Sequence, residues 1–491
     1  MASIRSEVYE LRFIEILYFL CATLLALYGY NSLVLAWFRV KRHKPTIIKR
    51  FNTNDDRPYV TVQLPIYNER YVVERLIEAV GDLKYPRHRL HIQVLDDSTD
   101  ITREIVAQAV KKQRLKGLDI EHIQRPDRYG YKGGALEFGL DSVKGEFIAI
   151  FDADFLPSPD YLEEIMPYYQ DSPAIGCLQA RWGHINQEAS WLTRAQANGI
   201  NGHFIIEQEV RCGHDLFLNF NGTAGVWRKT CIEDAGGWHH DTLTEDLDLS
   251  YRAQLKGWQI KYIPHVIAPA ELPVHINAFK RQQFRWAKGS IQTARKLLKD
   301  LWHSSNPFIK KVEATIHLTH YIVHPLMLFN LIIALPLILY KSSFLWITPI
   351  FLFAAIGPLL MYWVAMGEKE ETNLRKIYNL AMLLVLGMGL SLNNSLAVFE
   401  ALLGKQSAFL RTPKFNISEE NIAIKINEYI LPRDPFAWLE ILLALYATGL
   451  LFFVLTKGIW SLVVWLIFYA GGYFYIAGLN FWQAQKRSYE P

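Results

Sequence analysis

Two aspartates, Asp152 and Asp154, stand one residue apart after an apolar run at 146–151 that has the pattern of a buried strand. Side chains alternate along a strand, so both carboxylates would lie on one side of its tip. Paired carboxylates bind Mg2+ or Mn2+ through one or two oxygens and leave positions for a diphosphate. A capped turn explains the same residues, since Asp-x-Asp arises by chance about once in a chain this long. Its place after a strand favours the metal site.

A second acidic motif, Thr244-Glu245-Asp246, stands just before a predicted helix at 247–255. Asp246 could act as a general base that removes a proton from an attacking hydroxyl. Thr and Asp in this position would serve equally well as an N-terminal helix cap. The residues alone leave both interpretations open.

A third motif lies in the basic stretch 278–299, which is predicted to be helical. Gln282, Arg285 and Trp286 follow at i, i+3 and i+4, so they fall on adjacent turns of one face. The Arg fork suits a pyrophosphate, and the Trp ring offers a flat surface to a sugar. An amphipathic helix on a membrane surface would carry the same residue types. The pattern itself is rare, on the order of one in a hundred chains at average residue usage.

Alternating apolar runs and helical stretches predict the elements that position these motifs. Strands are expected at 59–64, 90–95, 118–123, 147–151 and 175–179. Helices are expected between them at 69–83, 99–116, 133–143 and 159–169. This alternation predicts a mostly parallel α/β sheet, in which ligands bind beyond the carboxyl ends of the strands. The sequence carries neither a dinucleotide-binding nor a P-loop fingerprint.

Charge is segregated along the 491 residues, which are 51% hydrophobic and 20% charged overall. Only two charged residues occur in 312–366, two in 436–481 and one in 13–38. The chain therefore combines a soluble-type middle with apolar segments, which excludes a purely soluble enzyme, a pure membrane bundle and a disordered chain. The net charge of +4 is too small and too dispersed to indicate a nucleic-acid partner. Four cysteines without metal-ligand spacing are expected to be reduced thiols.

Apolar runs of about 20 residues predict membrane spans. We expect five of them, at 14–37, 318–340, 344–366, 438–456 and 459–481. The basic stretch 39–50 places the middle domain in the cytoplasm, without distinguishing a bacterial plasma membrane from a Golgi membrane. A sixth run, 377–399, contains Asn393-Asn394-Ser395, and a crossing there would put the basic stretch 404–435 outside. We therefore expect an interfacial or re-entrant helix there, with six spans as the alternative.

In chain order, these motifs resemble the signature of the processive glycosyltransferase family 2 enzymes, which include cellulose, hyaluronan and mannan synthases. The likeness is strongest to the plant cellulose-synthase-like glucomannan 4-β-mannosyltransferases. It rests on these strings, spread densely over 58–300: Leu64-Pro-Ile-Tyr-Asn-Glu69, Val94-Leu-Asp-Asp-Ser-Thr-Asp100, Gly130-Tyr-Lys-Gly-Gly-Ala-Leu136, Ala149-Ile-Phe-Asp-Ala-Asp-Phe155, Gln179-Ala-Arg-Trp182, Phe220-Asn-Gly-Thr-Ala-Gly-Val-Trp-Arg228, Ala235-Gly-Gly-Trp238 and Gln282-Gln-Phe-Arg-Trp286.

The resemblance implies a GT-A (Rossmann-like) domain that transfers a sugar with inversion, and it implies roles for single residues. The nucleotide would be bound by Tyr67, Glu69, Asp97, Lys132, Asp152, Gln282 and Arg285, and the divalent metal by Asp152 and Asp154. The base would be Asp246, and the acceptor sugar would be contacted by Asn221, Gly222, Glu245 and Trp286.

A further string, Phe409-Leu-Arg-Thr-Pro-Lys414, resembles the FxVTxK gating loop of cellulose synthases. The likeness implies a gating role for Phe409, Thr412 and Lys414. The string departs from the motif at Arg411, where the family has Val. A gating loop must lie on the side of the catalytic domain, which agrees with an interfacial helix at 377–399.

Together these inferences predict a GT-A domain joined to a transmembrane helical bundle. The expected parts are an N-terminal transmembrane anchor (1–44), the GT-A domain (45–272), interfacial amphipathic helices (273–312), two transmembrane helices with an interfacial helix (313–403), a cytoplasmic gating-like loop (404–436) and two C-terminal transmembrane helices (437–491).

The predicted activity is the metal-dependent, inverting polymerisation of a β-linked glycan from GDP-mannose or UDP-glucose. The partners would be the nucleotide sugar, the growing polysaccharide and the lipid bilayer, and no residue indicates an accessory subunit. One alternative is a non-processive transferase acting on a lipid, of the ceramide glucosyltransferase kind. A second, from another class, is a nucleotide-sensing membrane receptor or a transporter.

Overall fold

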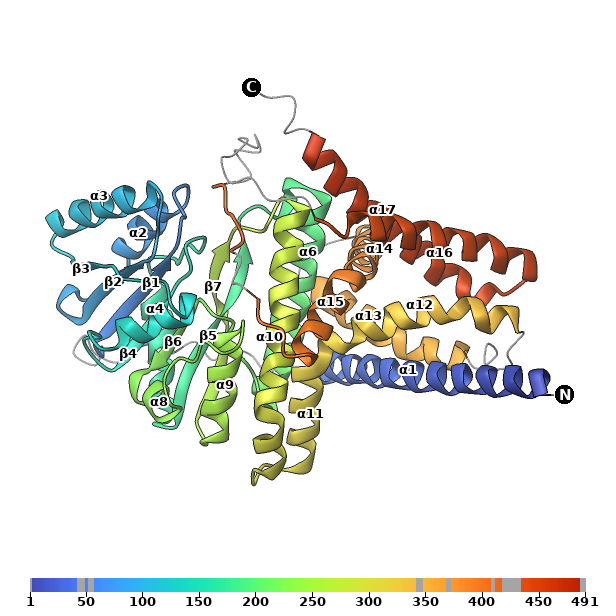
Figure 1. Cartoon of the computed structure of the whole chain (residues 1–491). Coiled ribbons are helices and arrows are strands. Elements are labelled where there is room, and N and C mark those ends of the chain that lie inside the picture. Colours follow the sequence, from blue (N-terminus) through green and yellow to red (C-terminus); the bar gives the residue numbers. More distant parts are fainter. Residues whose placement is uncertain are drawn as a thin grey trace.

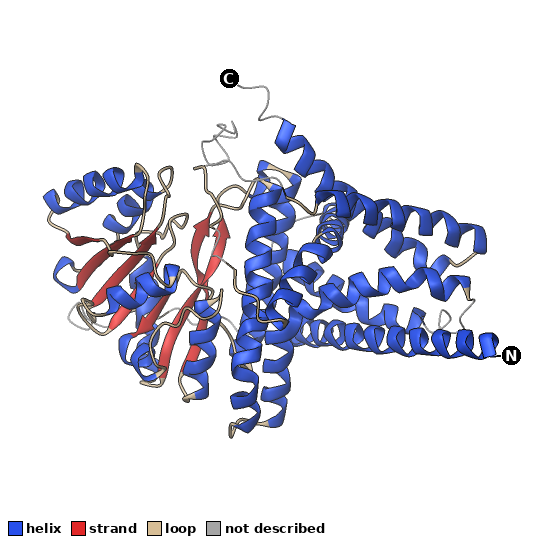
Figure 2. Ribbon diagram, in the orientation of Figure 1, coloured by secondary structure: helices blue, strands red, loops and turns tan. Residues whose placement is uncertain are grey.

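The computed structural model describes residues 2–41, 49–51, 57–340, 348–367, 372–407, 411–416 and 434–485. In these ranges a mixed α/β domain adjoins a set of long helices (Figure 1). Figure 2 shows the strands gathered at one end of the molecule and the long apolar helices at the other. The predicted fold class, an α/β domain of the GT-A type joined to a helical bundle, is therefore confirmed.

The α/β domain is built on one seven-stranded sheet with the order β3-β2-β1-β4-β6-β5-β7. Its strands are β1 (Val60–Ile66), β2 (Leu90–Asp96), β3 (Asp119–Ile123), β4 (Phe147–Ile150), β5 (Ile175–His184), β6 (Gly225–Arg228) and β7 (Gln259–Ala270). Strands β1 to β4 pair in parallel, and β5 is parallel to β7. Strand β6 runs antiparallel to both of its neighbours, β4 and β5. The sheet is thus mostly parallel, as predicted, with one reversed strand inside it.

Two strands, β6 and β7, were not predicted from the sequence. Strand β6 has only four residues, too few to show an alternating pattern. Strand β7 contains Pro264 and Pro269, which argue against a strand because proline cannot donate a ladder hydrogen bond. The structure tolerates both prolines because β7 is an edge strand of the sheet.

Apolar side chains from helices cover both faces of the sheet. One face is packed by α2 (Val73–Gly81), α3 (Thr102–Leu115) and α5 (Tyr161–Ile165), whose buried residues share one core with β1 and β2. The other face is packed by α4 (Tyr131–Leu140), α8 (Lys229–Asp234) and α9 (Glu245–Leu255). Covering both faces leaves the ends of the strands as the open edge on which polar residues can gather.

A second layer of helices stands between the sheet and the bundle (Figure 1). It contains α6 (Trp191–Asn201), the π-helical η5 (Gly202–Gln208), α7 (Glu209–Gly213), α10 (Ile276–His303) and α11 (Phe308–Thr319). The third motif lies on α10, as predicted, and α10 packs against α9 and against the helices that follow it in the chain. This layer therefore carries the motif residues toward both the sheet and the bundle.

The bundle contains α1 (Ala2–Lys41), α12 (Val323–Leu339), α13 (Thr348–Met366), α16 (Ala437–Lys457) and α17 (Val463–Gln485). Among the described residues, four helices are long and apolar enough to cross a membrane: Arg12–Lys41, Phe308–Leu339, Ala437–Lys457 and Trp460–Gln483. They coincide with four of the predicted spans. The predicted span at 344–366 lies partly outside the described residues, and only Ala355–Met366 is found there as a shorter apolar helix.

The sixth apolar run forms two helices, α14 (Asn373–Gly389) and α15 (Ser391–Leu402), bent by 45° at their junction. Such a pair is either a broken span or a re-entrant loop. The polar residues that motivated the interfacial interpretation are bonded to other helices: Asn393 Nδ2 donates to the carbonyl of Lys280 at 3.0 Å, and Asn394 Nδ2 lies 3.0 Å from Nε2 of His324. These bonds give the two amides hydrogen-bond partners inside the protein, which lipid could not supply.

Candidate active site

The loops that follow β1, β2 and β4 meet at one edge of the sheet, because these strands are parallel neighbours. The first two loops are bonded to each other: the N–H of Asn68 donates to Oγ of Ser98 at 2.9 Å, and the N–H of Thr99 donates to Oδ1 of Asn68 at 2.8 Å. Asn68 has a φ of 54°, a left-handed conformation that Asn adopts more readily than most residues. This edge carries the predicted nucleotide-binding residues Tyr67, Glu69, Asp97 and Asp152.

Two arginines contact the side chains of Asp97 and Tyr67 at this edge. Nε and Nη2 of Arg125 lie 3.0 and 2.5 Å from the two carboxylate oxygens of Asp97, a bidentate ion pair. The guanidinium of Arg128 lies 3.4 Å from the ring centroid of Tyr67. Neither arginine was predicted from the sequence. Both belong to Arg125-Pro-Asp-Arg128, and this basic turn between a strand and a helix could have indicated them.

Each aspartate of the first motif is paired with a lysine. Nζ of Lys132 lies 2.5 Å from Oδ1 of Asp152, and Nζ of Lys414 lies 2.5 Å from Oδ2 of Asp154. Burial lowers the pKa of Lys132, but the charges of Asp152 and Glu245 outweigh burial and raise it overall. The two carboxylates thus form an anionic site that pairs with a lysine on each side.

The predicted base, Asp246, lies in the first turn of α9 and is half-buried. Its Oδ1 accepts a bond from the N–H of Leu247 at 2.8 Å. Burial, with the neighbouring charge of Glu245, raises the pKa of Asp246 to about 7, although Lys132 and Arg285 oppose the shift. Thr244 makes no side-chain cap bond to α9, so the capping interpretation of this motif receives no support from Thr244.

Gly222 brings the main chain close to the side chain of Asp246. The residue has a φ of +82°, and a Cβ added to it would stand 2.8 Å from Oδ2 of Asp246. Only glycine allows both this conformation and this approach. The carbonyl of Gly222 also accepts a bond from Nζ of Lys132 at 2.8 Å. The predicted acceptor residues Asn221 and Gly222 therefore lie between the base and the Lys132–Asp152 pair.

Asp246 lines a cavity of about 760 Å3 that extends into the helical bundle. Asp246, Trp286, Asn221 and Trp182 line its end at the catalytic domain. The rest of its wall includes residues of α6, η5 and α11 and of the apolar helices α1, α12, α13, α14 and α17. Within the described residues, Gln283 lines this cavity but the predicted Gln282 does not. The structure therefore brings together Asp246, Asn221 and Trp286, and it leaves Gln282 away from the cavity wall.

A smaller pocket of about 330 Å3 lies beside Glu245, the neighbour of Asp246 in the chain. Its wall includes Lys132 and Glu245, the turn at 240–243, Gln292 of α10, and Ser407. Lys132 also contacts Asp152, so the pocket lies between the first acidic motif and the second. Polar groups converge there from several elements far apart in the chain, an arrangement typical of small-molecule sites.

The described part of the gating-like string, residues 411–416, reaches the same edge from far along the chain. Nη1 of Arg411 lies 2.8 Å from Oε1 of Glu69, and Lys414 bonds both Asp154 and the carbonyl of Glu271. Burial raises the pKa of Glu69 to about 8, although Arg411 opposes this. Thr412 is buried in this segment, and Phe409 lies outside the described residues. Arg411, where the string departs from the family motif, thus forms an ion pair with Glu69.

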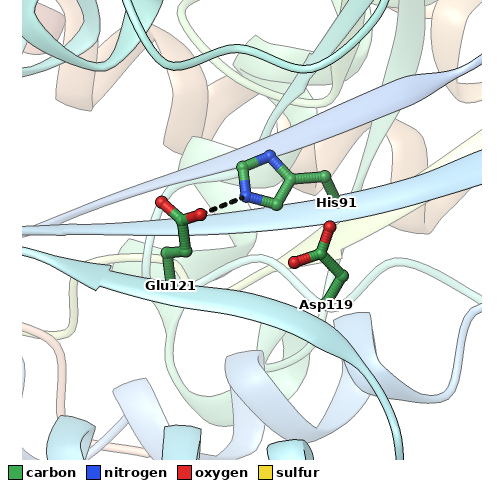
Figure 3. A group of neighbouring side chains, drawn as sticks. All are labelled: His91, Asp119 and Glu121. Atoms are coloured by element: carbon green, nitrogen blue, oxygen red, sulfur yellow. Dashed lines mark ion pairs between the residues drawn. The ribbon is translucent and has the colours of Figure 1, made fainter.

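Two other clusters in the described chain have donor atoms close enough to hold a metal, and both already contain a lysine. In the first, His91, Asp119 and Glu121 face one another on β2 and β3 (Figure 3). Lys144 lies 2.8 Å from Asp119 and 3.5 Å from Glu121. The second cluster is held together by Lys296, which bonds each member: His239, Asp241 and Asp248. Neither cluster is at the edge that carries the predicted metal ligands.

Comparisons with known proteins agree with this geometry. Residues 58–289 match the family model described as "Glycosyltransferase like family 2". The chain is 40% identical over 284 residues to a probable glucomannan 4-β-mannosyltransferase of Arabidopsis thaliana, a match covering 55% of this chain and 51% of that protein. It is 43% identical over 248 residues to a glucomannan 4-β-mannosyltransferase of Cyamopsis tetragonoloba, covering 50% and 47%. The chain thus spans about half the length of the curated relatives it matches.

Among solved structures, a mannosyltransferase of Pyrobaculum calidifontis in complex with GDP-Man and Mn2+ is similar to this chain with a TM-score of 0.54. The two are 20% identical, and the match covers 80% of this chain and 100% of that one. At this level of identity the likeness establishes a shared fold.

Proposed function

We propose that this protein, whose residues 58–289 match the model of glycosyltransferase family 2, is a membrane-embedded, inverting transferase that polymerises a β-linked glycan from a nucleotide sugar. The product would be a mannan, a glucomannan or a glucan, built from GDP-mannose or UDP-glucose. The observation that carries the proposal is the shared cavity: Asp246 and Trp286 line one end of a space that continues among the apolar helices. A polymer that starts at the base would have a path away from it.

In the proposed reaction, the carboxylate of Asp246 takes the proton of an acceptor hydroxyl. The acceptor oxygen then bonds to the anomeric carbon of the donor while the bond to the nucleoside diphosphate breaks, which inverts that carbon. Trp286 would stack on the terminal acceptor sugar, and Asn221, Gly222 and Glu245 would fix its position. Arg285, whose charge already acts on Asp246, would neutralise the leaving group together with Lys132. Tyr67 and Asp97 would hold the base of the nucleotide.

We propose Asp152 and Asp154 as the ligands of a divalent metal, Mg2+ or Mn2+. Two carboxylates that each attract an ammonium group to 2.5 Å offer the charged oxygen donors such ions require. A metal bound there would neutralise negative charge that develops on the diphosphate. Lys414 would then exchange its contact with Asp154 for one with the nucleotide, in keeping with a gating role for Thr412 and Lys414.

The membrane arrangement is part of the proposal. The basic stretch 39–50 favours a cytoplasmic catalytic domain, since positively charged loops stay on that side. The division into 1–44, 45–272, 273–312, 313–403, 404–436 and 437–491 remains a prediction. A cytoplasmic 404–436 would keep the 411–416 segment beside the sheet edge that it contacts.

The function is tested by incubating the purified full chain in detergent with Mn2+ and either GDP-mannose or UDP-glucose. We expect one donor to yield a β-linked polymer, identified by linkage analysis and by size. A product carrying one sugar on a lipid would instead indicate a non-processive transferase. Absence of transfer from every nucleotide sugar would contradict the proposal and leave a receptor or transporter.

The pH dependence of transfer is a second test. Burial and Glu245 raise the pKa of Asp246 to about 7, and only the carboxylate form accepts a proton. Transfer at saturating donor is therefore expected to rise as pH increases through about 7 and to reach a plateau above it. The measurement is kcat across about pH 5 to about pH 9. A profile that is already flat well below pH 7 would exclude Asp246 as the base.

A further inference from the structure

A π-helical segment, η5, lies in the wall of the large cavity close to its catalytic end. It spans Gly202–Gln208 between α6 and α7, and its residues His203 and Glu207 line the cavity together with Arg211. π-Helical turns are rare and are found frequently at functional sites, because they change where side chains point within a helix. None of these three residues has a role in the reaction proposed above.

His203 links η5 to the predicted acceptor loop. Its Nδ1 lies 2.8 Å from Oε2 of Glu207, and its Nε2 lies 2.9 Å from Oδ1 of Asn221. Nδ2 of Asn219 donates to the same Oδ1 at 2.9 Å, which identifies this atom of Asn221 as the acceptor. The amide of Gln208 also lies 3.1 Å from Nε2 of His203, but it donates to the carbonyl and Oδ1 of Asn219 at 3.0 and 3.2 Å. The ring of His203 is therefore bonded on both sides, to Glu207 at Nδ1 and to Asn221 at Nε2.

The surroundings of Glu207 keep it charged for this role. Burial alone would raise the pKa of Glu207, but the hydrogen bond from His203 and the charge of Arg211 outweigh burial and lower it far below its usual value. Nε of Arg211 lies 3.0 Å from Oε1 of Glu207, and Arg211 also lies 3.7 Å from Glu313. Five further titratable groups interact with this pair from the surrounding helices: Tyr251, His317, His320, Tyr321 and Tyr362.

We propose that the His203–Glu207 pair positions the Asn219–Asn221 segment for the acceptor, through the hydrogen bond between Nε2 of His203 and Oδ1 of Asn221. This inference rests on the proposed function and names a determinant of acceptor binding. Asn221 precedes Gly222, the residue that lies against Asp246, so the orientation of Asn221 sets the main chain beside the base. The pair is partly exposed, 27% for His203 and 22% for Glu207, and its open side is the cavity.

An acceptor bound in this cavity would meet hydroxyl-binding groups on the side of η5. Its first sugar would lie at Trp286 and Asp246, and the next would pass the Asn219–Asn221 segment. The chemical class expected is therefore an oligosaccharide of at least two hexosyl units rather than a single sugar. Neutral amides oriented by this half-buried pair suit such a ligand, because they form hydrogen bonds without attracting metal or nucleotide.

The test compares three variants of the full chain: His203→Phe, His203→Gln and Glu207→Gln. Phenylalanine removes both bonds of the ring, whereas glutamine can still donate to Asn221 without carrying a charge. We measure the affinity for a β-linked hexose trisaccharide by calorimetry, without donor, and the KM for the same acceptor during transfer. Glu233→Gln on the outer helix α8 is the matched control, since Glu233 is exposed and pairs with a lysine four residues away on the same helix.

For His203→Phe and Glu207→Gln we expect acceptor affinity to fall at least about tenfold, with unchanged affinity for the nucleotide and unchanged hydrolysis of the donor by water. His203→Gln should retain most of the affinity. A merely structural role would not produce this difference between His203→Phe and His203→Gln.

Wild-type affinity in His203→Phe, an equal loss of affinity in His203→Phe and His203→Gln, or no oligosaccharide binding by the wild type would each overturn the inference. If the wild type binds the trisaccharide and the variants lose affinity as expected, but no sugar is transferred, the proposed function fails and the positioning pair stands. If it transfers sugar and the variants behave as the control does, the proposed function stands and the positioning pair fails.

Discussion

Replacing Asp246 by Asn is expected to lower the rate of sugar transfer by about 10²–10⁴-fold, the usual contribution of a general base. The amide would keep the shape of the side chain but could not accept the acceptor proton. The affinity for the nucleotide should change little, because the predicted nucleotide contacts lie at the ends of β1, β2 and β4. The measurement is the rate of product formation at saturating donor and acceptor, with nucleotide affinity determined in parallel.

The same variant should not be less stable than the wild type. The folded state raises the pKa of Asp246 to about 7, so ionisation of this carboxyl costs stability progressively as pH rises above its unfolded pKa of about 4, and the cost is complete above about 7. A neutral Asn avoids the cost, and we expect a higher melting temperature at about pH 8. Glu78→Gln, an exposed change on α2, serves as the control and should affect neither quantity. Transfer at a wild-type rate by the Asp246→Asn protein would refute the assigned base.

Replacing Asp154 by Asn is expected to reduce transfer by about 10³-fold, since a metal on the diphosphate contributes several kcal/mol to the transition state and each tenfold in rate corresponds to about 1.4 kcal/mol. The change removes one of two charged oxygen donors and also the partner of Lys414. Both the metal and the 411–416 segment would then lose a contact. The measurement is transfer as a function of Mn2+ or Mg2+ concentration.

Treatment with a chelator distinguishes the contribution of the metal to the transfer rate from that of the protein's own charged groups. Wild-type protein treated with EDTA should fall to the rate of the Asp154→Asn variant, and added Mn2+ or Mg2+ should restore the wild type alone. An Asp154→Asn protein that responds to metal like the wild type would show that Asp154 is not a ligand. A wild type that is insensitive to the chelator would contradict the metal dependence itself.

Much of the catalytic layout was predictable because it depends on short stretches of chain. The apolar runs that became β1, β2 and β4 and the polar residues after them are adjacent in sequence, and parallel neighbours must end at one edge. The prediction also placed Arg285 and Trp286 on a helix. It omitted β6 and β7, because four residues are too few for a pattern and prolines conceal an edge strand.

The candidate site was predicted less completely than the fold. Asp246, Asn221 and Trp286 share one cavity, whereas Gln282, which was predicted to contact the nucleotide, is not in its wall. The role of Gln282 at the nucleotide stays a prediction. The arginines beside Tyr67 and Asp97 were overlooked because basic turns are common on protein surfaces, where they simply face solvent.

The sequence by itself determined which groups are available and which local element carries each: paired aspartates after a strand, a carboxylate at a helix start, Trp286 on α10, and apolar helices long enough for a membrane. The tertiary structure alone decided their partners. Lys414 reaches Asp154 across 260 residues of chain, Arg411 reaches Glu69, and η5 turns His203 toward Asn221. The physical reason is range: periodicity and capping act over a few residues, whereas ion pairs and cavities depend on how distant segments pack.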